Sequence, residues 1–126
     1  MKQSEKLEIK QLKETEDSLQ SKCFIWHWNT YPDKRGRLFH VNQKARNKIE
    51  GNRMKAMGVV PGISDLIYLR PKDEGNLYIE MKTEIGTQSK EQKEFERLVT
   101  RLGYQYIICR SFDQFQSIFG NLTPPV

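Results

Sequence analysis

The chain has 126 residues, of which 37% are hydrophobic and 29% are charged, and its net charge is +5. This length suits one domain, residues 1–126 with tails at 1–5 and 121–126, and the composition excludes a disordered chain. No run approaches the roughly 18 apolar residues of a membrane span, and the first residues lack the apolar core of a signal peptide, so we expect a cytoplasmic protein with no membrane partner.

The positive charge is concentrated in residues 34–55. Eight Lys and Arg residues fall there against one Glu, a net charge of +7, so the rest of the chain carries −2 of the total of +5. A basic segment on a slightly acidic body suits a polyanion, because each Lys or Arg that neutralises a phosphate releases counterions. The alternative is an ordinary solvated surface stretch, and the charge pattern alone does not decide between them.

The first predicted element is a helix from about residue 6 to beyond residue 20. Its apolar stripe consists of Leu12, Leu19 and Cys23. Glu16 lies on the same stripe, and burying an unpaired carboxylate there would be costly. Glu16 therefore either has a partner or is a half-exposed structural residue.

Residues 23–29, CFIWHWN, are compatible with two structures. Their alternation suits a strand, whereas their continuity with the preceding helix suits more helix. We favour helix, ended at Tyr31-Pro32. A short strand over residues 38–41 follows, and then a weak helix over about residues 49–57 that Gly58 terminates.

The next segment is typical of a hairpin. Residues 66–69 and 77–82 form two strands, and residues 71–76 form the loop between them. Ser89 followed by Gln92 has the spacing of a capping box, and an amphipathic helical pattern continues from there to Gly103.

A buried strand over residues 104–109 and a last helix capped by Ser111 complete the chain. The whole order is helix, strand, helix, strand, strand, helix, strand, helix, which predicts an α/β fold with a mixed sheet. Cys23 and Cys109 lie in apolar stretches without CxxC spacing, so we expect reduced, buried thiols rather than a disulfide or zinc site.

Three charged residues interrupt the hairpin. Asp65 directly precedes its first strand, and Glu80 and Lys82 lie near the end of its second. Pairing Arg70 with Leu77 would put Asp65 opposite Lys82 and would place all three charges on one face. A slip of one residue would separate Asp65 from Glu80, so the interpretation depends on the register.

Two converging carboxylates suit a hard divalent cation such as Mg²⁺ or Mn²⁺, with the backbone carbonyl of Met81 as a further ligand. Such an ion polarises a phosphoryl oxygen and lowers the pKa of bound water. The Lys82 ammonium can hold the attacking water or offset charge on the phosphate. Alone, the Asp, Glu and Lys pattern is weak, because Glu and Lys two apart on a solvent-facing strand are common; the turn and basic segment beside it favour catalysis.

Three segments then resemble the signature of the PD-(D/E)XK nuclease superfamily, specifically its VRR-NUC branch: GVVPGISD at 58–65, EMK at 80–82 and SKEQ at 89–92. The resemblance extends over nearly the whole chain and implies a restriction-endonuclease-like core, a small mixed sheet flanked by helices. It also implies that Asp65 and Glu80 bind the metal, that Lys82 is the catalytic lysine and that Gln92 assists at the site.

EDSLQ, residues 16–20, resembles the family's first-helix E-x-x-x-Q, which implies that Glu16 reaches the metal and that Gln20 lies beside it. The chain departs from the family pattern at Ser64, where proline is common. Gln92 has a competing structural role as the capping-box partner of Ser89, and the sequence allows either role or both. His40 lies in a segment that resembles one near the family's substrate, but we assign it no role.

The hypothesis is a Mg²⁺- or Mn²⁺-dependent DNA endonuclease. Its basic segment engages the DNA backbone through Arg35, Arg37, Lys44, Arg46, Lys48, Arg53 and Lys55. The small stand-alone proteins that the chain resembles process DNA junctions in bacteria or phage-infected cells, which implies a homodimer acting on branched DNA such as four-way junctions. The alternatives are a DNA-binding module that cleaves little or not at all, and an interaction domain whose basic segment binds an acidic protein.

Overall fold

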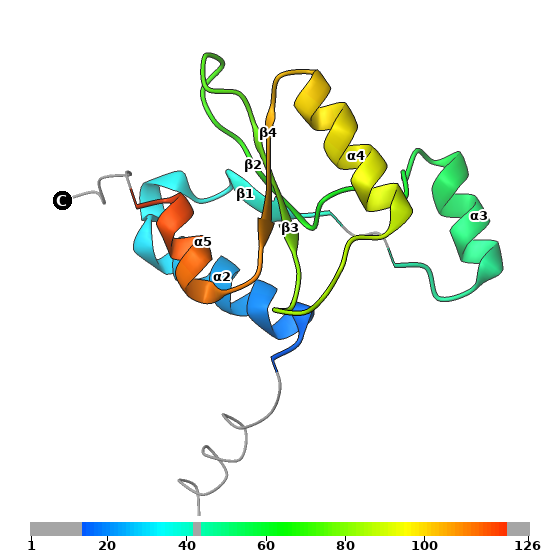
Figure 1. Ribbon diagram of the computed structural model, residues 1–126, viewed down its shortest axis with the longest axis horizontal. Helices are drawn as coiled ribbons and strands as arrows, with labels where there is room; N and C mark the ends of the chain where they lie inside the picture. The colour runs from blue at the N-terminus through cyan, green and yellow to red at the C-terminus, as the bar shows by residue number, and fades with distance from the viewer. Residues whose placement is uncertain (1–13, 42–43, 121–126) are drawn as a thin grey trace, which may run out of the picture.

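A mixed sheet forms the centre of the computed structural model, which describes residues 14–41 and 44–120 (Figure 1). The strands lie in the order β1 (Leu38–His40), β2 (Leu66–Tyr68), β3 (Leu77–Met81) and β4 (Gln105–Cys109). β1 and β2 pair antiparallel, as do β2 and β3, whereas β3 and β4 pair parallel. The predicted α/β fold with a mixed sheet is confirmed, and the expected tails 1–5 and 121–126 lie outside the described residues.

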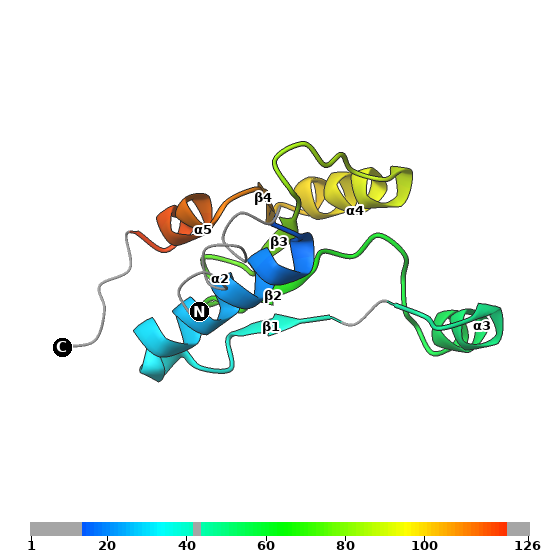
Figure 2. The ribbon, with the colours of Figure 1, turned by 90° about the horizontal axis from the view of Figure 1, so that it is seen from below.

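Helices cover both faces of this sheet. α2 (Glu16–Thr30) and α5 (Phe112–Ile118) lie on one side, and α4 (Lys90–Arg101) lies on the other (Figure 2). Successive side chains of a strand point to opposite faces. The main core therefore includes Leu77, Ile79 and Met81 of β3, while Tyr78 contacts Phe95 of α4 on the second face.

α2 begins later than the sequence predicts. Glu14 and Thr15 are not helical, so a continuous helix from residue 6 is wrong, and Leu12 lies outside the described residues. Thr15 and Ser18 form a capping box in which each side chain accepts a hydrogen bond from the other's backbone N–H at 3.0 Å. Because this cap satisfies the first N–H groups, it defines the helix start. The helix runs through CFIWHWN to Thr30, as predicted, and a short 3₁₀ turn, η1 (Pro32–Lys34), follows.

α3 (Lys48–Ala56) projects away from the sheet and has no buried residue (Figures 1 and 2). Asn47 caps its start by accepting a hydrogen bond from the Glu50 N–H. Gly58, with φ of +99°, adopts the left-handed conformation after its end, as predicted. The basic segment is therefore divided between this projecting helix and the η1–β1 region.

The register of the β2–β3 hairpin differs from the prediction. Leu77 pairs with Tyr68 rather than with Arg70. Arg70 lies in a longer loop, where its guanidinium donates to the carbonyl oxygens of Gly75 at 2.7 Å and Glu74 at 3.3 Å. The shift is two residues, so every side chain keeps its predicted face.

The two cysteines behave as expected. Cys23 and Cys109 are free thiols, fully buried in the main core. Around them, aromatic rings of α2 and α5 pack together; the Trp26 ring lies 6.1 Å from Phe115, edge to face. In the part of the chain that the structure describes, no helix has the length and apolar character needed to cross a membrane.

Candidate active site

The end of the sheet where β2 begins and β3 ends gathers the predicted residues. Since β2 and β3 are antiparallel, a residue just before β2 and residues at the end of β3 meet there. Extending the observed register by one pair places Asp65 opposite Glu80. Lys82 follows β3 directly, and the first turn of α2 brings Glu16 to the same place.

Asp65 is held by its neighbours through both backbone and side chain. Its Oδ2 accepts a hydrogen bond from the Met81 N–H at 2.7 Å. Its carbonyl oxygen lies 2.8 Å from His40 Nδ1 and 3.2 Å from the Val41 N–H. Burial raises the pKa of the Asp65 carboxyl group, and the Glu16 carboxylate adds to this shift, whereas the Met81 hydrogen bond opposes it.

Glu80 is completely buried, and neither of its carboxylate oxygens makes a well-formed hydrogen bond within the described residues, although Asp65 and Tyr106 lie close enough to affect its pKa. Burial, and then the neighbouring Asp65 carboxylate, raise the pKa of Glu80 to about 8 against the opposing effect of Lys82. Buried carboxylates normally have partners, because desolvation without one is costly. Glu80 is therefore a group that a cation would satisfy.

The donors at this end of the sheet fit a hard divalent cation. Asp65 and Glu80 present carboxylate oxygens side by side, which is the ligand chemistry that Mg²⁺ prefers. Across residues 14–41 and 44–120, however, no three His, Cys, Asp or Glu side chains are gathered closely enough to hold a metal. The pair fits such an ion without forming a complete protein cage, and Mg²⁺ sites commonly use one or two carboxylates with waters.

Glu16 contacts Lys82 rather than joining the carboxylate pair. Lys82 Nζ lies 3.5 Å from Glu16 Oε1; the lysine side chain is 10% exposed and the glutamate side chain 48%. Lys82, which is itself almost buried, is thus the partner that the sequence analysis requires for the Glu16 carboxylate. Whether Glu16 also serves a metal stays a prediction, as does a ligand role for the Met81 carbonyl.

Gln92 has the structural role that the sequence allows. Its Oε1 accepts a hydrogen bond from the Ser89 N–H at 2.8 Å, and its own N–H donates to Ser89 Oγ, which completes a capping box at the start of α4. Gln20 is half-buried and lies at the margin of a groove that His40 also lines. Ser64, where the family commonly has proline, is buried and donates from Oγ to the Leu66 carbonyl oxygen.

The predicted DNA-binding residues lie in two places. Arg35 and Arg37 flank η1 and β1, whereas the others follow the chain into α3: Lys44, Arg46, Lys48, Arg53 and Lys55. Two of them have acidic neighbours, since Lys44 lies 3.4 Å from Asp17 and Arg46 lies 2.8 Å from Glu50. These exposed pairs are weak and leave the segment basic overall.

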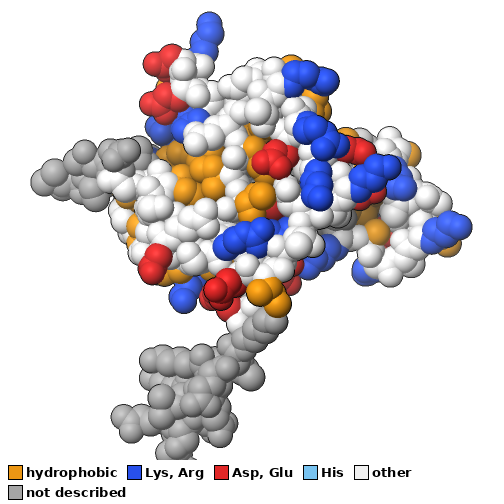
Figure 3. Space-filling view, in the orientation of Figure 1, with side chains coloured by type: hydrophobic (Ala, Val, Ile, Leu, Met, Phe, Trp, Pro, Cys, Tyr) orange, Lys and Arg blue, Asp and Glu red, His pale blue; other side chains and the backbone are white. Residues whose placement is uncertain are grey.

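α4 carries a basic stripe that our sequence analysis missed. Exposed cationic residues recur every three or four positions on the side of the helix opposite the buried Val99: Lys90, Lys93, Arg97 and Arg101. Figure 3 shows Lys and Arg side chains over both α4 and α3. Helical spacing alone would have found this stripe, but three Glu residues on the same helix conceal it in a net-charge count.

Other residues near the site could not be identified from local sequence patterns. His40 contacts the Asp65 carbonyl, and Tyr106 lies close enough to Glu80 to influence its pKa. Arg110 donates from Nη1 to the carbonyl oxygens of Thr83 at 2.9 Å and Gly86 at 2.6 Å, which holds the segment after Lys82. Each contact joins residues far apart in sequence, so no spacing rule predicts it.

Comparison with known proteins identifies the family. The model of the VRR-NUC domain family matches residues 3–113. The chain belongs to the VRR-NUC family. A solved structure described as a "VRR_NUC domain protein" has 22% sequence identity to this chain and a TM-score of 0.67, covering 86% of this chain and 88% of the other. None of the curated proteins matches the chain. As a VRR-NUC domain it is a nuclease-fold protein that acts on DNA.

Proposed function

We propose that this VRR-NUC protein is a Mg²⁺- or Mn²⁺-dependent DNA endonuclease that selects branched DNA such as four-way junctions and acts as a homodimer. The observation that carries the nuclease proposal is Glu80, completely buried with two unpartnered carboxylate oxygens, beside Asp65 at the end of the hairpin. A protein that only bound DNA would gain nothing from burying such a pair, since an unsatisfied carboxylate destabilises the fold.

Asp65, Glu80 and the Met81 carbonyl would hold the metal, which supplies polarisation of the phosphate and a lowered pKa for bound water. Lys82 is placed to hold the attacking water or to offset the charge that develops on the phosphate. Its ion pair with Glu16 orients the nearly buried ammonium. His40 positions Asp65 by donating from Nδ1 to its carbonyl oxygen. Gln92 would assist at the site while it caps α4, and Gln20 would lie beside the metal.

The basic residues supply the contacts to DNA. Phosphate contacts fix a protein's register on DNA without reading sequence, which suits an enzyme that selects DNA shape. α3 and the stripe on α4 present exposed cations on adjacent parts of the surface (Figure 3). Together they would hold the backbone on either side of the scissile phosphate.

Cleavage assays test the proposal. Synthetic four-way junctions, flaps and linear duplexes of matched length are incubated with the protein in Mg²⁺, in Mn²⁺ and in EDTA. We expect products from junctions with either metal, none in EDTA, and at least tenfold slower cleavage of linear duplex. Junction binding without any metal-dependent product would contradict the nuclease proposal and favour a DNA-binding module.

Sedimentation of the protein with and without a junction tests the dimer. A homodimer places two sites for paired cuts. Protein that remains monomeric on a junction that it cleaves would remove the dimer from the proposal and leave the chemistry untouched.

A further inference from the structure

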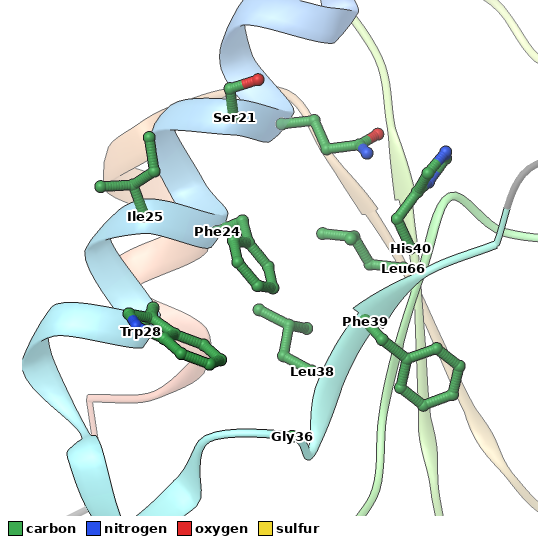
Figure 4. Close-up of a pocket in the computed structure, with 10 residues that line it drawn as sticks. Ser21, Phe24, Ile25, Trp28, Gly36, Leu38, Phe39, His40 and Leu66 are labelled. Atoms are coloured by element: carbon green, nitrogen blue, oxygen red, sulfur yellow. The ribbon is translucent and has the colours of Figure 1, made fainter.

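A groove of about 530 Å³ lies between α2 and β1, beside the candidate active site. Figure 4 shows Phe24 and Trp28 projecting from α2 toward β1, with Leu38 of β1 between the two elements. At one end the groove includes His40, whose Nδ1 contacts the Asp65 carbonyl oxygen at 2.8 Å. The groove is therefore continuous with the residues that surround the scissile phosphate in the proposed function.

Its wall is unusually apolar for a free surface. Trp28 is 42% exposed and Ile25 is 57% exposed. The Phe24 and Trp28 rings stack at 5.9 Å with an interplanar angle of 28°, so they form a continuous aromatic surface along α2. Exposed apolar surface of this kind, rimmed by polar residues, marks a binding site.

A cation lies on this aromatic surface. The Arg35 guanidinium carbon is 4.9 Å from the centre of the Trp28 ring, and Arg35 Nε donates to the Trp28 carbonyl oxygen at 2.9 Å. Unstacked nucleobases are held by aromatic rings and by the guanidinium planes of arginines that lie over such rings, and a guanidinium also neutralises the phosphate of the base.

We propose that this groove binds one unpaired nucleobase of the DNA, with Trp28 as its stacking residue and Arg35 at its phosphate. The inference rests on the proposed function for the place of the scissile phosphate, but it adds a ligand class, a single unstacked base. An enzyme that holds such a base beside its cleavage site favours branch points, bulges and flaps over continuous duplex, because a base leaves the stack there at a lower cost in free energy.

A second copy of the chain is the competing occupant. A two-fold contact through this patch would bring two copies of the exposed Arg35 into one interface, and the described residues that line the groove include no Asp or Glu to pair with them. The β1 edge is also only three residues long, too short for an extended sheet between copies. Both features favour an anionic ligand with an aromatic ring over a like-charged copy.

Binding to two matched duplexes in EDTA tests the proposal without any cleavage. One duplex carries a single bulged thymine, and the other carries an abasic residue at that position, so their backbone charges are equal. We expect the full-length protein to bind the thymine bulge about tenfold more tightly, the effect of one stacked base. Equal affinity for the two duplexes would overturn the proposal.

Two substitutions separate stacking from general apolar contact. Trp28→Phe keeps an aromatic ring and should keep most of the preference, whereas Trp28→Leu should lose it and bind the abasic duplex as the parent does. A preference that survives in Trp28→Leu would refute the stacking role. Sedimentation of the parent and of Trp28→Leu tests whether a second copy of the chain occupies the groove. If the parent is a dimer and Trp28→Leu is a monomer, the groove binds a second copy and the base site is overturned.

The binding experiments distinguish failure of the base site from failure of the nuclease proposal. Failure of cleavage in Mg²⁺ or Mn²⁺ would contradict the enzyme and leave the base preference to be measured. Loss of the base preference with cleavage intact would contradict the groove alone.

Discussion

Asp65, Glu80 and Lys82 meet at one end of the hairpin but differ in how they are satisfied. Asp65 accepts a hydrogen bond from Met81 and Lys82 pairs with Glu16, while the Glu80 oxygens have no partner within the described residues. Sites that retain an unsatisfied buried group sacrifice stability for function. This difference separates the expected roles of the three residues.

Substitutions of Asp65, Glu80 and Lys82 should distinguish residues that bind the metal from a residue that acts only in catalysis. We expect Asp65→Ala or Glu80→Ala to abolish cleavage and to weaken Mn²⁺ binding measured by calorimetry. Lys82→Ala should lower the cleavage rate by about a hundredfold or more with Mn²⁺ affinity kept, because Lys82 holds the attacking water or offsets charge on the phosphate and is not a metal ligand. A Lys82→Ala protein that cuts at the parental rate would show that this mechanism is wrong.

Glu80→Gln should make the metal-free protein more stable. The substitution replaces a buried, unpartnered carboxylate with a neutral group of the same shape, and we expect a gain of about 1–3 kcal/mol in the free energy of unfolding. Urea denaturation in EDTA measures it, with Glu84→Gln, an exposed neighbour, as the control.

Adding Mg²⁺ or Mn²⁺ should stabilise the parent more than Glu80→Gln, since a ligand that binds only the folded state shifts the unfolding equilibrium. Equal stabilisation of both proteins by metal would place the ion elsewhere.

At the scale of elements, the approach of the chain to Asp65 depends on a close contact with α4. Gly62 has φ of +86°, and a Cβ there would lie 2.4 Å from the Glu91 carbonyl carbon and 2.8 Å from the Gln92 N. The turn and the first turn of α4 are thus packed backbone to backbone. The capping box of Ser89 and Gln92 stabilises the helix end that receives this turn.

Gly62→Ala should destabilise the protein by about 3 kcal/mol or more, because strain from a left-handed conformation adds to a clash with backbone that cannot move. Gly36→Ala is the matched control. Its φ is +96°, but a Cβ there meets nothing within 4 Å, so only the strain of about 1 kcal/mol applies. Similar unfolding midpoints for the two variants would mean that the turn moves away from α4.

The contributions of α3 and α4 to DNA binding can be tested separately. Arg46→Gln with Arg53→Gln tests α3, and Lys93→Gln with Arg97→Gln tests α4. Each pair should reduce the slope of log K against log salt by about 2 if both residues contact phosphates. Lys72→Gln, in the loop at the other end of the hairpin, is the control. An unchanged slope for a pair would exclude that helix from the interface.

At the scale of the whole molecule, the core that joins α2 to the sheet contains a buried histidine. His27 is 2% exposed, its Nε2 has no partner within the described residues, and rings of Tyr31, Tyr68 and Phe119 surround it. Burial, and then the positive charges of Lys34 and Arg37, lower its pKa to about 4. The folded protein therefore holds His27 neutral at pH values where the unfolded chain binds a proton.

Stability should consequently fall as pH decreases from about 6.5 to 4, by up to about 3 kcal/mol from this residue. The sign follows because the unfolded state binds more protons over that interval. Urea denaturation across this pH range measures the slope, and His27→Gln should flatten it. An identical slope in parent and variant would show that His27 is protonated in the folded state as readily as in the unfolded chain.

Much of the architecture follows from local pattern. The hairpin, the capping box at Ser89, the helical reading of CFIWHWN and the mixed sheet are all predicted, because neighbouring residues control turns, caps and periodicity. The errors lie where local signals compete or end. The predicted helix runs through Thr15, whereas Thr15 caps the start of α2. The predicted pairing of Arg70 with Leu77 gives a shorter loop than the one observed, in which Arg70 donates a hydrogen bond to the Gly75 carbonyl oxygen.

Local sequence patterns are enough to predict the α/β class and the family. They also predict that Asp65, Glu80 and Lys82 share one face, because side chains alternate along a strand and a register shift of two residues leaves their faces unchanged. The structure adds that Asp65 faces Glu80, that Glu16 pairs with Lys82, that His40 contacts Asp65 and that α2 and β1 enclose an aromatic groove. These contacts join residues distant in sequence, so packing rather than local preference determines them.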